Sequence, residues 1–169
     1  MRKKKEINPK TRMQIAIGLG IIVIVSAVFI NYYLDQTKIT GQQFGDQLAQ
    51  IQLDLKNETL VFDGHLTEFK TGQIPKDQML SITDNHIATL QKILPRYEKL
   101  NAPELFVPSL QLFKLSTETQ IESVKALRQW IITGDNATNQ KSEQLYGQSF
   151  QYEMNALQSY ENAKTKGSQ

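Results

Sequence analysis

The sequence contains no cysteine, and it has only two histidines and one tryptophan among 169 residues. The missing cysteines exclude disulfides, thiolate catalysis, zinc–thiolate and iron–sulfur centres, covalent haem attachment and the lipidated cysteine of a lipoprotein. A di-iron bundle needs Glu-x-x-His steps, yet Phe62 and Thr83 stand three residues before His65 and His86. We therefore expect each histidine to be a partly exposed helix residue, not a metal ligand.

Several catalytic signatures are missing as well. The metalloprotease pair, the nucleophile elbow, the phosphate-binding glycine loop and the dinucleotide fingerprint are all absent. Residues 135–137 begin like a calcium loop, but Ala137 stands where an oxygen ligand is needed. Glu118 and Glu122 lie one helical turn apart with no opposing acidic cluster, which is typical of a solvated face. The sequence predicts a protein that is not an enzyme and that binds no metal or cofactor.

Acidic residues are scarce at the N-terminus, so the net charge of +2 is unevenly distributed. Six of the 19 lysines and arginines precede residue 13, together with only one of the 17 acidic residues. The remaining chain carries 13 basic and 16 acidic residues and is mildly acidic. Nucleic-acid binding needs a clustered basic face on the folded domain, so we expect no nucleic acid among the partners.

The sequence has one long hydrophobic run, from Ile15 to Ile30, which is uncharged. Extended to residues 13–34 it gives a helix of roughly 33 Å, enough to cross a hydrocarbon core of about 30 Å. Tyr32 and Tyr33 fall where an aromatic belt meets the membrane interface. The basic flank at residues 1–12 predicts a cytoplasmic N-terminus and an extracytoplasmic C-terminal part, hence a single-pass protein of the cell membrane.

The hydrophobic run at residues 15–30 has two alternative interpretations. A cleaved signal peptide has a shorter apolar core that ends at small residues, and Val25-Ser26-Ala27 fits such a site. The residues after Ala27 are still strongly apolar, which favours an uncleaved anchor. A pilin also begins with a basic leader and a hydrophobic helix, but the small residue before the cleavage point and the early helix glutamate are missing, and the remaining chain is predicted to be helical.

The predicted membrane helix carries small residues on one face, at steps of four, three and four: Ala16, Gly20, Val23 and Ala27. Small residues let helices in lipid approach closely, so this face is a candidate contact for a homo-oligomer. The alternative is that small residues are simply common in such helices. The lipid bilayer is the expected partner in either case.

After Lys38, hydrophobic residues recur with a period of about 3.6, which predicts helices rather than strands. Four amphipathic segments are expected: one ending at Thr71-Gly72-Gln73, one from about Pro75 to Leu100 with a kink at Pro95, one from about Ser109 to Thr133-Gly134-Asp135, and one from about Asn139, which can cap it. The predicted fold is all-α, with an extracytoplasmic antiparallel four-helix bundle (up-down-up-down) at residues 38–164 and a frayed tail at residues 165–169.

Some apolar residues lie off these stripes. In the connection after residue 100, Leu105, Phe106 and Val107 are expected either to cap the bundle or to form an exposed contact patch. Trp130 adjoins the inward face of the third helix, so it is predicted either to pack in the core or to anchor an interface. Asn57 and Asn136 begin Asn-x-Thr triplets and are possible glycosylation sites.

In its layout, the predicted bundle resembles the four-helix ligand-binding modules of bacterial chemoreceptors and sensor kinases. The resemblance covers residues 38–164 as a pattern and rests on no motif. Such receptors have a second membrane helix leading to a cytoplasmic module, whereas this sequence stops at Gln169, so we expect a sensor of this kind to work through a partner. The leading prediction is a non-enzymatic scaffold or accessory subunit that contacts another membrane or envelope protein. The alternative is a small-molecule binding bundle.

Overall fold

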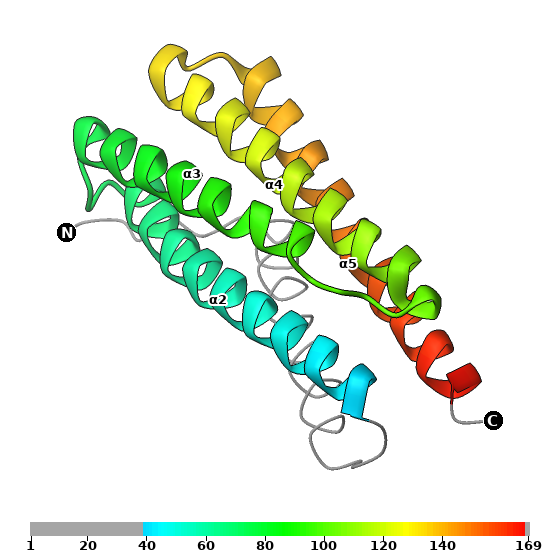
Figure 1. Cartoon of the computed structure of the whole chain (residues 1–169). Helices are drawn as coiled ribbons and strands as arrows, with labels where there is room; N and C mark the ends of the chain where they lie inside the picture. Colours follow the sequence, from blue (N-terminus) through cyan, green and yellow to red (C-terminus); the bar gives the residue numbers. More distant parts are fainter. Residues whose placement is uncertain (1–38, 168–169) are drawn as a thin grey trace. The chain divides into compact units, whose positions relative to one another are not determined.

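A computed structural model describes residues 39–167 of the chain, and these residues are almost entirely helical. The predicted all-α class is confirmed, and no strand occurs within this range. The helices pack as a bundle (Figure 1). In chain order they are α2 (Ile39–Lys70), α3 (Lys76–Glu98), the short 3-10 helix η1 (Glu104–Phe106), α4 (Val107–Thr133) and α5 (Asn136–Gly167).

The predicted membrane segment, residues 13–34, lies outside the described residues. The same holds for its small-residue face at Ala16, Gly20, Val23 and Ala27, and for the basic residues 1–12. Among the helices of residues 39–167, none is long and apolar enough to cross a membrane.

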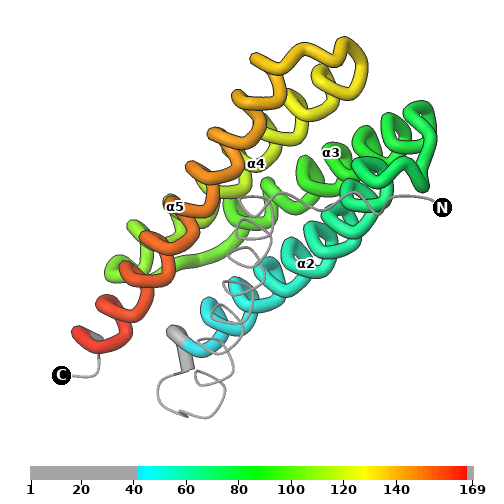
Figure 2. The backbone as a smooth tube through the Cα atoms, turned by 180° about the vertical axis from the view of Figure 1, so that it is seen from behind, coloured from blue at the N-terminus to red at the C-terminus, as the bar shows by residue number. Residues whose placement is uncertain are grey.

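Consecutive helices are neighbours in the bundle. α2 packs against α3, α3 against α4, and α4 most closely against α5, as seen from both sides in Figure 1 and Figure 2. Within the described residues, α2 and α5 make at most a marginal backbone contact. The bundle therefore consists of two hairpins, α2–α3 and α4–α5, joined through α3 and α4.

Two glycines end helices as the sequence predicts. Gly72 has a φ of +77°, and the backbone N–H groups of Gly72 and Gln73 donate to the carbonyls of Phe69 and Glu68, which is the Schellman arrangement. Gly134 has a φ of +72°, and its N–H donates to the carbonyl of Trp130. Because an L side chain is strained at these angles, glycine fixes both helix ends.

Some helix boundaries differ from the predicted ones. α5 begins at Asn136 and not at Asn139, because the Asp135 carboxylate accepts the Ala137 backbone N–H at 3.0 Å and caps the first turn. α4 begins at Val107, two residues before Ser109, and Pro108 occupies its first turn, where the missing N–H has no cost. α5 also runs on to Gly167 through the segment expected to fray. In agreement with the prediction, α3 continues past Pro95, to Glu98.

Small side chains line the contact between α4 and α5, which we call the small-residue seam. Ser116 and Ser123 on α4 each donate a hydroxyl hydrogen bond of 2.8 Å to a backbone carbonyl of α5, at Ser149 and Ser142 respectively. Such contacts require the two helix backbones to approach closely, which only small residues allow. The buried members recur every seven residues on both helices: Ser109, Ser116 and Ser123 on α4, with Ser142, Ser149, Ala156 and Ala163 on α5.

Two exposed glycines interrupt helices at positions where a side chain would fit. A Cβ atom built on Gly64 of α2 or on Gly147 of α5 meets no atom within 4 Å. Because alanine is favoured over glycine inside a helix by about 1 kcal/mol, Gly64→Ala and Gly147→Ala should each raise the free energy of unfolding by roughly 0.5–1 kcal/mol. Thermal melting followed by circular dichroism measures this, with Gly134→Ala as the matched control. The Gly134→Ala control should have a lower melting temperature, because alanine is strained in the left-handed backbone conformation of residue 134. Stabilisation by all three substitutions would contradict this explanation.

Candidate functional site

Hydrogen bonds between buried polar side chains cross the bundle interior, and we call them the polar core network. Gln52 Nε2 donates to the Tyr97 hydroxyl at 2.8 Å, and that hydroxyl lies 3.1 Å from Thr117 Oγ1. Gln120 Nε2 donates to Thr59 Oγ1 at 2.9 Å. Gln52 and Thr59 belong to α2, Tyr97 to α3, and Thr117 and Gln120 to α4, so the network holds three helices in register. Since a buried polar group without a partner costs about 1–3 kcal/mol, shifting one helix against the others is unfavourable.

His86 lies in the core next to this network, and the prediction that it is a partly exposed helix residue is wrong. Its side chain is 1% exposed, and its Nδ1 lies 2.9 Å from Glu58 Oε1. The imidazole also stacks on the Phe62 ring, with centroids 4.1 Å apart and planes inclined by 4°. Burial is tolerated because the ring has both a carboxylate and an aromatic partner on α2.

The surroundings of His86 favour its neutral form. Burial lowers its pKa, and the hydrogen bond and charge of Glu58 only partly offset that effect. The second ring nitrogen, Nε2, is buried and has no hydrogen-bond partner among residues 39–167. The proton of the neutral ring therefore sits on Nδ1, which donates to Glu58. A second proton, on Nε2, would have no acceptor in the core.

Two carboxyl groups also have pKa values that are shifted toward the neutral form. Burial raises the pKa of Asp63 on α2 to about 6, although Lys70 and a hydrogen bond from Tyr146 on α5 lower it. Burial also raises the pKa of Glu153 on α5 to about 7. The hydroxyl of Tyr146 has its pKa raised by burial and by the charges of Asp63 and Glu153. Perturbed carboxyls of this kind occur at functional sites more often than elsewhere.

The three apolar residues at positions 105–107, where η1 meets α4, differ in their packing. Phe106 packs its ring on Phe44 of α2 and Tyr160 of α5, with centroids 5.5 Å and 5.0 Å away. Leu105 and Val107 on either side of it remain 49% and 36% exposed. Phe106 thus caps the bundle, while its two neighbours present apolar surface at the same end.

Trp130, for which core packing was favoured over an interface, is half-buried. The Trp130 ring contacts Phe69 of α2 edge to face, with centroids 6.1 Å apart. This contact joins the last turns of α2 and α4 at the bundle end opposite Phe106.

The remaining predicted positions lie at the surface. Asn136 is exposed as the first residue of α5, whereas Asn57 is exposed in the middle of α2. Glu118 and Glu122 face solvent beside Lys114 and Lys125. Within residues 39–167, no three histidine, cysteine or acidic side chains come together as a possible metal site.

One feature of the sequence indicates the polar interior. The apolar stripe of α2 misses a turn at Glu58 and Thr59, and these two residues pair with His86 and Gln120. A break in a stripe that continues on both sides indicates that the facing helices supply polar partners. The partners themselves, His86 and Gln120, lie in separate helices and cannot be identified from spacing alone.

The arrangement provides hydrogen bonds that fix helix positions and three ionisable groups whose pKa values are shifted by burial. Its ionisable members are His86, Asp63 and Glu153, and each lies in the bundle interior or between helices. Comparison with known protein families, with curated proteins and with solved structures found no match for this chain.

Proposed function

We propose that this chain is a membrane-anchored, non-enzymatic accessory subunit, whose extracytoplasmic up-down-up-down bundle is a rigid docking body for another membrane or envelope protein. The observation that carries the proposal is the polar core network. Its inward polar side chains bond to one another across α2, α3 and α4, so they stabilise a fixed shape.

The outer surface of α2 offers apolar contacts for such a partner. Leu53 is 48% exposed and Val61, two turns further on, is 60% exposed. Exposed aliphatic residues on a helix that has already buried a full apolar stripe are candidates for an interface. α2 is also the helix that directly follows the proposed anchor, so a partner in the same membrane can reach it.

Replacing both residues should remove the partner without unfolding the bundle. In detergent extracts of native membranes, we expect the Leu53→Glu/Val61→Glu variant to lose a protein that copurifies with the wild-type chain. A photo-crosslinking residue at position 61 should form an adduct with that same protein. Both substitutions lie on the surface, so melting followed by circular dichroism should change little.

The matched control is a photo-crosslinking residue at Gln91, which is exposed on α3. It should give no adduct. If the wild-type chain is a clean monomer in several detergents and position 61 forms no adduct in membranes, the proposal of an accessory subunit is wrong.

A small-molecule binding bundle is the alternative, and a different observation supports it. Asp63 and Glu153 are partly buried carboxyls with raised pKa values, which ligand sites often contain. Thermal melting of the full chain in detergent against a panel of metabolites separates the two functions, because a ligand that binds the folded state raises the melting temperature. The accessory-subunit proposal expects no such increase.

A further inference from the structure

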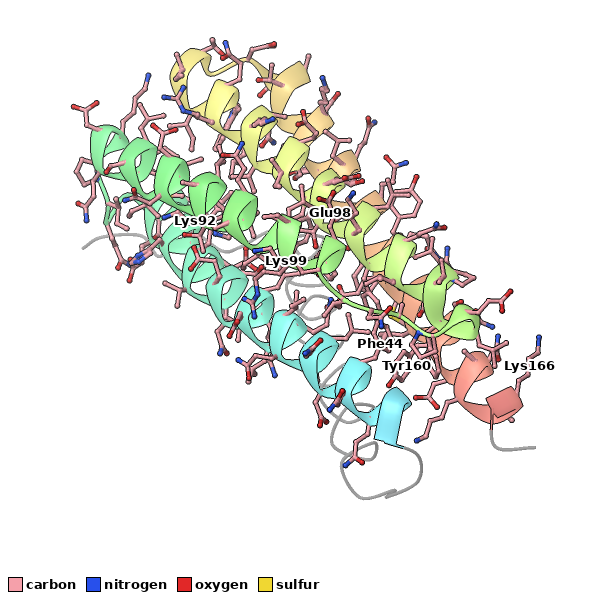
Figure 3. The ribbon with its side chains drawn as sticks, in the orientation of Figure 1. Phe44, Lys92, Glu98, Lys99, Tyr160 and Lys166 are labelled. Atoms are coloured by element: carbon pink, nitrogen blue, oxygen red, sulfur yellow. The ribbon has the colours of Figure 1, made fainter. Side chains whose placement is uncertain are left out.

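The apolar end of the bundle around η1 has a defined structure. Phe106 is fixed between Phe44 and Tyr160, so the backbone that carries its neighbours is held in place. Leu105 and Val107, on either side of Phe106 in the chain, stay exposed, at 49% and 36%. Figure 3 shows Phe44 and Tyr160 at this end, with Lys166 from the last turn of α5. The exposed leucine and valine are therefore held on a rigid support.

The length of chain before α2 limits where this end can lie. Only residues 35–38 separate the predicted membrane segment, which ends at residue 34, from the start of α2 at Ile39. Such a connection spans at most about 18 Å. The 32 residues of α2 extend roughly 48 Å further, to the turn at Gly72. Under the proposed membrane anchor, this short connection limits how far the end with Phe44 and η1 can lie from the bilayer.

We propose that Leu105 and Val107 insert into the lipid interface and hold the bundle upright on the membrane, an inference that rests on the anchor in the proposed function. Aliphatic side chains gain free energy by leaving water for the boundary between headgroups and acyl chains. Lys166 is exposed at the same end, where its ammonium group suits the phosphate layer. Glu104, also exposed, limits the depth because its carboxylate stays among the headgroups.

The absence of cysteine from the chain makes a direct test simple. A nitroxide label is placed at Leu105→Cys in the full-length protein, reconstituted in phosphatidylcholine nanodiscs, and its collisions with oxygen and with a water-soluble nickel complex are measured. The matched control is Ile132→Cys, a comparably exposed aliphatic position (39%) at the opposite end of the bundle. We expect the label at 105 to collide several-fold more with oxygen than with nickel, and the label at 132 to show the reverse.

The possible outcomes separate this inference from the proposed function. If alkaline carbonate releases the chain from membranes, the anchor itself is wrong. If the chain stays integral but the label at 105 is as accessible to nickel as the label at 132, the insertion is wrong and the anchor stands. If both labels report lipid, the bundle lies flat on the membrane, which also overturns the upright arrangement. Circular dichroism of each labelled variant checks that the bundle is folded.

Discussion

Replacing His86 with phenylalanine is expected to protect the bundle against acid. In the folded chain the pKa of His86 is lowered by burial, whereas the unfolded value is near 6.5, so the unfolded state binds more protons below that pH. The histidine therefore costs stability as pH falls through 6.5, by up to about 1.4 kcal/mol for each pH unit until the folded pKa is reached. Phenylalanine retains a ring to stack on Phe62 and cannot be protonated.

The measurement is thermal or urea unfolding of the full chain in detergent between pH 8 and pH 5, expressed as the wild-type stability minus that of the variant. This difference should fall as the pH falls below 6.5. His65→Gln is the matched control, because it removes the only other histidine from the surface, where the ring is 39% exposed. A His86→Phe difference that does not change with pH would show that the buried ring has no role in acid sensitivity.

Replacing Glu153 with glutamine should have the opposite pH dependence. Burial raises the pKa of this carboxyl from its ordinary value of 4.5 to about 7, so the folded state holds the proton more tightly than the unfolded state. The charged form is therefore disfavoured in the bundle, and stability falls as the pH rises from about 4.5 to 7. Removing the charge should raise the free energy of unfolding at pH 8 by up to about 3 kcal/mol, with little change near pH 4.

Glu143→Gln is the control for this variant, because Glu143 also lies on α5 but is exposed. Its melting temperature should follow that of the wild type at every pH, while Glu153→Gln should melt several degrees higher at pH 8. Destabilisation by Glu153→Gln at pH 8 would mean that the carboxylate has a stabilising partner when it is ionised.

These two titrations oppose each other in the wild-type chain. Between pH 5 and 7, falling pH removes the cost of Glu153 and of Asp63 while it adds the cost of His86. The stability of the unmodified protein should consequently change less with pH than the stability of the His86→Phe variant, in which nothing opposes the two carboxyls. A flat wild-type profile is therefore no sign that these buried groups are inert.

Much of the helical framework could be predicted from the sequence. Hydrophobic period, Gly72 and Gly134 were sufficient to place the four helices, because a left-handed helix end depends on local conformation. The burial of the His86 side chain was not predicted, because it depends on Glu58 and Phe62, which belong to another helix. Propensity and spacing carry no information on such a pairing, which exists only after the helices pack.

The apolar segment before α4 shows the same limit at another place. Its sequence was consistent with a cap on the bundle and also with an exposed patch. The structure contains both, since Phe106 packs against the bundle while Leu105 stays exposed. Which residue turns inward depends on the short helix η1, whose three residues are too few to show a period. The two carboxyls with raised pKa values were not predicted for a related reason: Asp63 on α2 and Glu153 on α5 look like ordinary surface acids in a sequence.

The small-residue seam has a consequence for how the molecule moves. α4 and α5 meet backbone to backbone, with serine hydroxyls bonded to carbonyls of the facing helix, whereas α2 has no comparable contact with α5. Residues 107–167 are also contiguous in the chain, so this hairpin closes without waiting for distant segments. In hydrogen exchange the amides of α4 and α5 should be the last to be released, and the α2–α3 hairpin should open as a separate cooperative unit.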